Sequence, residues 1–274
     1  MINDLFIKVK DKLGQYLLRI RHKKLVSDER TKCRVIYSDE HISNIIWLNG
    51  FYEKVELDLI IEYLKEKHPQ IFNHSVIDVG ANIGNHCCFF ANYFKKVIAF
   101  EPNNENFKLL QLNTSALQNV VINNKGVSNK NFDAVFSQIE SNMGKIRLET
   151  KQKEGIFTKC ITLDDYLTSN LDKVALIKID VEGHELEVLQ GAKKTIRKNR
   201  PILCIEILAN NRKSIQILEL LRELGYKKFY SVDREPKDGF RLIRILKICF
   251  GFRISLKPLQ FSDHIDYPIV ICEW

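Results

Sequence analysis

Residues 75–85 read Ser-Val-Ile-Asp-Val-Gly-Ala-Asn-Ile-Gly-Asn. The apolar run over 75–79 is typical of a buried strand, and it leads through Gly80 and Gly84 into a predicted helix over 85–94. Glycine allows a ligand to approach the backbone closely, and the amides at the start of a helix favour an anionic group. This stretch therefore predicts a ligand-binding turn at the carboxyl edge of a parallel sheet.

The next predicted strand, residues 96–100, ends at Glu101, where a carboxylate can accept the hydroxyls of a ribose. Together with the turn, Glu101 indicates a nucleoside cofactor. Three residues separate Gly80 from Gly84, so the dinucleotide pattern G-x-G-x-x-G is missing, which counts against the pyrophosphate of NAD. S-adenosylmethionine has no phosphate, and a backbone turn together with Asp78 can hold its amino-acid end.

Strands and helices alternate along the rest of the chain. Apolar strands that alternate with helices predict an α/β fold with a doubly wound, mostly parallel sheet that is covered on both faces. Two further strands, 227–232 and 268–273, should close a seven-stranded sheet as an antiparallel edge pair. The other predicted elements are strands at 119–123, 175–179 and 202–207, helices at 104–117, 185–198 and 214–224, and an irregular hairpin region at 132–149.

Residues 1–70 are predicted to form an N-terminal cap of helices and short strands on a main domain over 71–274. The cap begins with a basic amphipathic helix over 4–25, which either docks on the core or contacts a membrane surface or a partner. Strands near 34–37 and 45–48 and a helix over 55–67 follow, and Pro69 ends that helix. Residues 239–261 form a lid over the substrate, a membrane-facing insertion or a packed insertion.

Composition limits the class of protein. The chain has 274 residues, of which 45% are hydrophobic, enough for one large domain. Its seven cysteines form no C-x-x-C pair and should be reduced, mostly buried thiols. No run reaches the roughly 18 apolar residues of a membrane span, and the start lacks the apolar core of a secretory signal, so we expect a cytoplasmic protein.

The net charge of +8 could favour an anionic partner, but a lysine-rich solvated surface is the preferred interpretation. No dense basic run is interleaved with aromatic residues, so we expect no nucleic-acid ligand. Peripheral contact with the inner membrane surface stays open, as does the oligomeric state.

Three strings in this order resemble the FkbM methyltransferase family. They are Val76–Asn85, Ala99–Asn103 and Ile177–Glu185, the last reading Ile-Lys-Ile-Asp-Val-Glu-Gly-His-Glu, and the match continues through 189–192, 200–202 and 205–206. The resemblance covers about residues 50–210. It implies a class I methyltransferase fold and methyl transfer from S-adenosyl-L-methionine, commonly to a hydroxyl of a sugar, polyketide or similar metabolite.

The resemblance also implies which residues bind the cofactor. Gly80, Asn82 and Gly84 match the cofactor turn, and Glu101 matches the ribose ligand. The resemblance places Gly126, Val127 and Ser128 beside the adenine. It also places a loop with Asn142, Met143 and Gly144 near the site.

Asp180, Glu182 and His184 follow the predicted strand 175–179 and should lie beside the central crevice. Methyl transfer is an in-line displacement that chiefly requires alignment of the acceptor oxygen with the methyl group. We expect Asp180 to face the sulfonium and Glu182 or His184 to accept the hydroxyl proton.

Other roles are consistent with the same residues. His184 opens a helix, where it can simply cap the helix or face solvent, and Glu185 can interact favourably with the helix dipole. Asp180, Glu182, His184 and Glu206 include only oxygen and nitrogen donors, so a metal site is an alternative, although we expect no required metal.

The predicted function is O-methylation of a hydroxyl on a sugar or glycan intermediate, as in polysaccharide biosynthesis, or on a related metabolite. The acceptor is a small molecule or glycan that is either free, nucleotide-linked or lipid-linked. Two alternatives are an NAD-dependent oxidoreductase, which the glycine spacing disfavours, and a catalytically silent scaffold or binding module.

Overall fold

The computed structural model describes residues 36–37, 41–137, 147–149, 156–168, 172–209, 211–234, 254–262 and 264–274. The chain divides into two compact units, Met1–Lys54 and Val55–Trp274. The predicted division into a cap over 1–70 and a main domain over 71–274 stays a prediction.

Helix α2 (His41–Asn49) belongs to the first unit. The prediction of a strand at 45–48 is wrong, because these residues lie inside this helix. A run of four apolar residues does not distinguish a buried strand from a buried helix by periodicity. The predicted helix over 4–25 lies outside the described residues, and of the predicted strand at 34–37 only 36–37 are described, in no strand.

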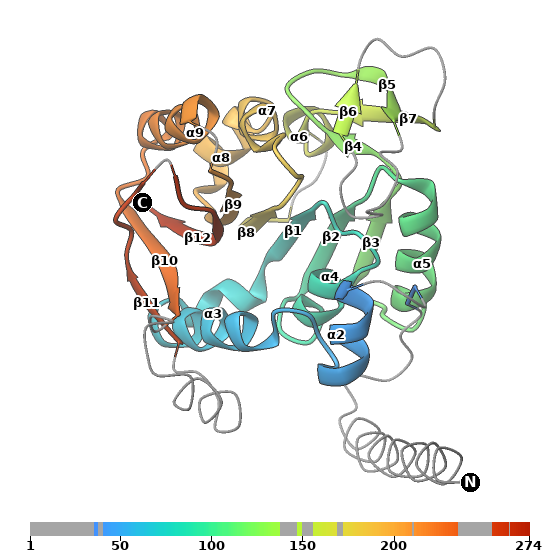
Figure 1. The fold of residues 1–274 in the computed structure, drawn as a ribbon, viewed down its shortest axis with the longest axis horizontal. Coiled ribbons are helices and arrows are strands. Elements are labelled where there is room, and N and C mark those ends of the chain that lie inside the picture. The colour runs from blue at the N-terminus through green and yellow to red at the C-terminus, as the bar shows by residue number, and fades with distance from the viewer. Residues whose placement is uncertain are drawn as a thin grey trace, which may run out of the picture. The chain divides into compact units, whose positions relative to one another are not determined.

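A large mixed sheet forms the centre of the second unit (Figure 1). Its strand order is β11-β10-β12-β9-β8-β1-β2-β3, and the five strands from β9 to β3 are parallel. The doubly wound, mostly parallel fold is therefore confirmed. The strands are β1 (Ser75–Val79), β2 (Lys96–Phe100), β3 (Val120–Asn123), β8 (Val174–Ile179), β9 (Ile202–Ile207), β10 (Lys228–Arg234), β11 (Ile254–Pro258) and β12 (Tyr267–Glu273).

The predicted seven strands become eight, because β11 extends the sheet beyond β10. The two strands are antiparallel, with Val232 opposite Leu256. Along β11, the half-buried Ile254 and Leu256 alternate with exposed residues, which is the pattern of a strand with one solvated face. This strand falls within the predicted insertion 239–261, of which residues 239–253 lie outside the described part of the chain. The predicted antiparallel pair, β10 and β12, is confirmed.

Helices cover both faces of this sheet. In Figure 1, α3 and α4 lie on one side, and α7, α8 and α9 lie on the other. Within the described residues, no helix is long and apolar enough to cross a membrane. The helices are α3 (Lys54–Lys67), η2 (Pro69–Asn73), α4 (Asn85–Phe90), α5 (Asn104–Thr114), α6 (Leu163–Tyr166), α7 (Glu185–Gln190), α8 (Lys193–Asn199) and α9 (Asn211–Leu224).

The helix predicted over 185–198 is two helices that meet at Gly191. A Cβ atom at Gly191 would lie 2.0 Å from the carbonyl oxygen of Ser128, so α7 ends where the chain approaches another backbone. Ser128 follows β4 (Gly126–Val127), which belongs to a second sheet in the order β4-β7-β5-β6. The other strands of this sheet are β5 (Phe132–Ser137), β6 (Arg147–Glu149) and β7 (Ile156–Ile161).

Side chains alternate between the two faces of the central strands. Ile77, Ile177 and Leu203 pack into the core with buried residues of α6 to α9. The opposite face carries Asp78 and Lys178, which are register partners in β1 and β8. The five cysteines in the described part of the chain are free and buried, as predicted.

Candidate functional site

The strand order reverses between β1 and β8, which places a crevice at their carboxyl ends. Two strand-to-helix turns meet there. The first runs from Gly80 to Gly84, and its backbone is left-handed at Gly80 (φ 81°), Asn82 (φ 51°) and Gly84 (φ 96°). A Cβ at Gly80 would lie 1.8 Å from the carbonyl oxygen of Asp180, so only glycine fits.

Glu101 supports the first turn from the end of β2. Its Oε2 accepts a hydrogen bond from the amide of Asn82 and its Oε1 from the amide of Asn103, each at 2.8 Å. Burial raises the pKa of Glu101 to about 7, against the lowering effect of these amide hydrogen bonds. A carboxylate has about four acceptor positions, and the two amides and the Asn106 side chain use up to three of them, so Glu101 keeps the capacity to accept from a hydroxyl group.

Lys178 joins the two turns from inside the sheet. Its Nζ lies 3.3 Å from Oδ1 of Asp78 and 3.2 Å from Oδ2 of Asp180, and it donates to the carbonyl oxygen of Gly80 at 3.3 Å. The Asp78 side chain is fully buried, whereas that of Asp180 is 37% exposed. Asp78 thus lies beneath the turn and acts on it through Lys178, while Asp180 is open to a ligand.

Sequence reasoning missed Lys178. The signal was a single cation inside the run Val-Ala-Leu-Ile-Lys-Ile, because a buried lysine needs a charged partner.

The pKa values of Asp180 and Glu206 are shifted in opposite directions. Burial raises the pKa of Asp180, but Lys178, His86 and hydrogen bonds from Lys178 and Glu206 outweigh it, so the net shift is downward. The pKa of Glu206 rises to about 9, first through burial and then through the charges of nearby carboxylates. At neutral pH, Asp180 is therefore an anion and Glu206 is a neutral acid.

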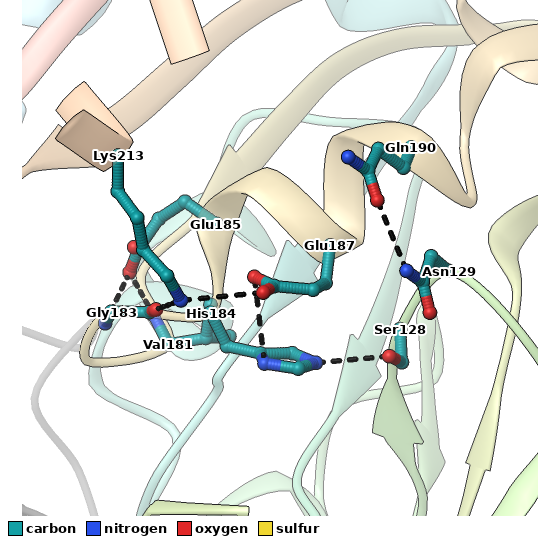
Figure 2. A network of polar contacts seen from close by, with 9 residues as sticks. All are labelled: Ser128, Asn129, Val181, Gly183, His184, Glu185, Glu187, Gln190 and Lys213. Atoms are coloured by element: carbon teal, nitrogen blue, oxygen red, sulfur yellow. Dashed lines mark hydrogen bonds and ion pairs between the residues drawn. The ribbon is translucent and has the colours of Figure 1, made fainter. Parts of the chain in front are cut away.

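His184 is engaged on both sides of its ring (Figure 2). Nε2 lies 2.9 Å from the hydroxyl of Ser128, and Nδ1 lies 3.6 Å from Oε2 of Glu187. Burial is the main cause that lowers the pKa of His184, so the ring is neutral at pH 7. Asp180, Glu182 and His184 share one turn, but His184 faces Ser128, which follows β4, and Glu187 of α7.

Glu185 organises the second turn. Its Oε1 accepts hydrogen bonds from the amides of Val181 at 3.2 Å and Gly183 at 2.9 Å, and its side chain is buried. Lys213 of α9 donates to the carbonyl oxygen of Gly183 at 2.9 Å (Figure 2). The side chain of Glu185 thus holds the loop that leads into its own helix, in addition to any effect on the helix dipole.

Gly126 and Val127 form β4 and are buried. A Cβ at Gly126 would lie 2.7 Å from Sγ of Cys160 and 3.7 Å from Cβ of Pro102, so β4 runs next to the residue that follows Glu101. The predicted loop at 142–144 lies outside the described residues. Among the residues that the structure describes, no group of three or more His, Cys, Asp and Glu side chains is arranged to hold a metal ion.

Comparison with known proteins gives a family match. The model of the "Methyltransferase FkbM domain" matches residues 78–228. A curated relative, hexuronic acid methyltransferase AglP from Haloferax volcanii, is 40% identical over 119 residues, which are 42% of this chain and 48% of the relative. This chain therefore spans about half the length of that relative.

Solved structures are similar at low sequence identity. The FkbM methyltransferase from Methylobacillus flagellatus KT is 16% identical with a TM-score of 0.44, over 74% of this chain and 44% of that one. The bifunctional kinase-methyltransferase WbdD is 11% identical with a TM-score of 0.45, over 92% of this chain and 45% of that one.

Proposed function

Because the chain belongs to the FkbM methyltransferase domain family, we propose that it transfers a methyl group from S-adenosyl-L-methionine to a hydroxyl of a sugar or glycan intermediate. The observation that carries the proposal is the pair of turns at the switch point of the sheet, joined by Lys178. The name of the curated relative makes a hexuronic acid the first acceptor to test.

The described residues fit the proposed cofactor. Gly80 packs against the carbonyl oxygen of Asp180, which fixes the turn, and the backbone of Gly80, Asn82 and Gly84 would contact the amino-acid end. Glu101, with acceptor capacity left, would bind the ribose, and Gly126 and Val127 would line the adenine. Asp78 would act through Lys178. The bound cofactor would supply an electrophilic methyl group on a positively charged sulfur.

Asp180 is the proposed electrostatic partner of that charge, because it is partly exposed and Lys178 favours its anionic form. Glu182 and His184 are the proposed acceptors of the hydroxyl proton. For His184 to accept it, Nε2 would have to exchange its contact with Ser128 for the acceptor hydroxyl. A His184→Ala variant with wild-type turnover would exclude this role.

The remaining organisation is also a proposal. We infer a cap over residues 1–70, a main domain over 71–274 and a lid or insertion within 239–261. We infer a cytoplasmic location, with peripheral contact at the inner membrane surface as an alternative, and an acceptor that is free, nucleotide-linked or lipid-linked.

Calorimetric titration with S-adenosylmethionine, S-adenosylhomocysteine and NAD tests the cofactor directly. We expect the wild type to bind the first two and Glu101→Ala to bind them at least about tenfold more weakly. Glu105→Ala is the matched control, because Glu105 lies on the surface of α5. Binding of NAD alone would support an oxidoreductase, and binding of none of the three would support a scaffold.

A further inference from the structure

One row of side chains crosses three strands at the open edge of the site. Lys178 is the register partner of both Asp78 in β1 and Cys204 in β9. Two residues further along each strand, on the same face, come Gly80, Asp180 and Glu206. Asp180 and Glu206 are therefore neighbours on adjacent strands, just above the buried Lys178.

Charge is unevenly distributed over this row. Lys178 already has two carboxylate partners, Asp78 and Asp180. Glu206 faces Asp180, Glu182 and Glu185, all acidic, with Lys178 as the cation near it, and His86 of α4 faces Asp180. A third anion beside one lysine is unfavourable, so a proton stays on Glu206.

The two oxygens of Glu206 differ. Asp180 and Glu206 each affect the other's pKa, so the two carboxyl groups are close enough to share a proton. Oε2 of Glu206 is buried and has no hydrogen-bond partner among the described residues. Because Oε2 is shielded from solvent, the group that satisfies it has to come from the protein, and a proton shared with the neighbouring Asp180 carboxylate does so, which leaves the other oxygen of Glu206 for a ligand.

We propose that Glu206 is an acceptor-binding residue that works as a neutral acid: it donates a hydrogen bond to Asp180 and receives one, through its second oxygen, from the acceptor hydroxyl. This inference rests on the proposed function, because it names the group that holds the acceptor of the methyl transfer. The contact orients the acceptor oxygen next to Asp180, where the positive charge of the donor would lie, and the neutral form adds no further anion.

Substitution distinguishes a neutral acid from a carboxylate. Glutamine has the same shape, and its amide can donate to Asp180 while its oxygen accepts from the hydroxyl. Leucine has a similar volume and can do neither. Glu219→Gln, on the exposed side of α9, is the control for loss of a surface charge.

The experiment measures kcat and KM for methylation of a glucuronic acid glycoside between pH 6 and pH 10, with calorimetry of S-adenosylhomocysteine on each variant. We expect Glu206→Gln to keep kcat/KM within about threefold of the wild type at pH 7, and Glu206→Leu to lose about 100-fold. Donor affinity should change less than twofold in both. Wild-type kcat/KM should fall above pH of about 9, where Glu206 ionises, and Glu206→Gln should lack this fall.

Equal loss of kcat/KM in the glutamine and leucine variants would overturn the inference, because it would mean that a carboxylate is needed. An alkaline fall that persists in Glu206→Gln would overturn it as well.

Thermal unfolding tests the protonation state of Glu206 in the absence of the substrate that accepts the methyl group. The folded pKa lies above the unfolded value, so the folded state holds the extra proton and wild-type stability declines as pH rises between about 4.5 and about 9. Glu206→Gln should therefore gain Tm over the wild type as pH rises through this range, whereas a constant difference would overturn the inference. If S-adenosylhomocysteine fails to bind the wild type, the proposed function fails separately.

Discussion

The two turns at the centre of the sheet are built differently. The β1–α4 turn is held by steric fit, since a Cβ at Gly80 would lie 1.8 Å from the oxygen of Asp180 and one at Gly84 would lie 2.8 Å from Cδ1 of Leu110. The β8–α7 turn is open at Gly183, where a Cβ would meet nothing within 4 Å. There, polar side chains hold the backbone, chiefly Glu185.

This difference suits the proposed roles of the turns. A tightly packed turn presents its backbone to a ligand with little freedom to move. A turn held by hydrogen bonds leaves open space beside Gly183 and carries Asp180, Glu182 and His184, the side chains with proposed catalytic roles. Substitutions should therefore destabilise the first turn through steric overlap and the second turn through the loss of hydrogen-bond partners.

The largest expected effect is that of Gly80→Ala. The added methyl group overlaps the Asp180 carbonyl and the backbone is left-handed, so we expect a loss of about 4 kcal/mol in the free energy of unfolding and no cofactor binding. Chemical denaturation and calorimetry measure both. Wild-type stability in this variant would show that the first turn is not held by steric fit.

Lys178→Met should have the next largest effect, because Lys178 connects the two turns. Removal of the ammonium leaves Asp78 buried and uncompensated, at a cost of about 3 kcal/mol. A Lys178→Met, Asp78→Leu double variant should recover part of this stability, and denaturant unfolding of all three proteins measures the coupling. No recovery would indicate that the ion pair is not the reason for the loss.

Glu185→Ala should destabilise the second turn by about 2 kcal/mol. The variant leaves the amides of Val181 and Gly183 without their acceptor. Glu185→Gln, which keeps an acceptor oxygen, should lose less than half as much, and unfolding by denaturant distinguishes the two. Equal losses would show that the charge of Glu185 matters more than its hydrogen bonds.

The smallest effect is expected for Gly183→Ala. The space around Gly183 is open, so the cost is only that of a left-handed alanine, about 1 kcal/mol. Thermal unfolding of this variant beside Gly80→Ala tests the comparison directly. A loss as large as that at Gly80 would mean that both turns depend on close packing.

Local features of the sequence were enough to predict most of the parallel sheet. The five parallel strands and the glycine turn were predicted within a residue or two, because apolar runs and glycine positions act over short distances. The sequence failed where local patterns were ambiguous. Residues 45–48 are helical rather than extended, and β11 was taken as part of an insertion.

The sequence by itself determined the family, the order of the five parallel strands, and the candidate side chains that follow β1, β2 and β8. Only the tertiary structure decided which of them meet. Lys178 reaches Asp78 and Gly80 across adjacent strands, and His184 meets Ser128 over a separation of 56 positions. Such contacts depend on strand order and on the burial of charge, which set both the partners and the protonation states. For that reason the raised pKa of Glu206 could be inferred only once its neighbours were known.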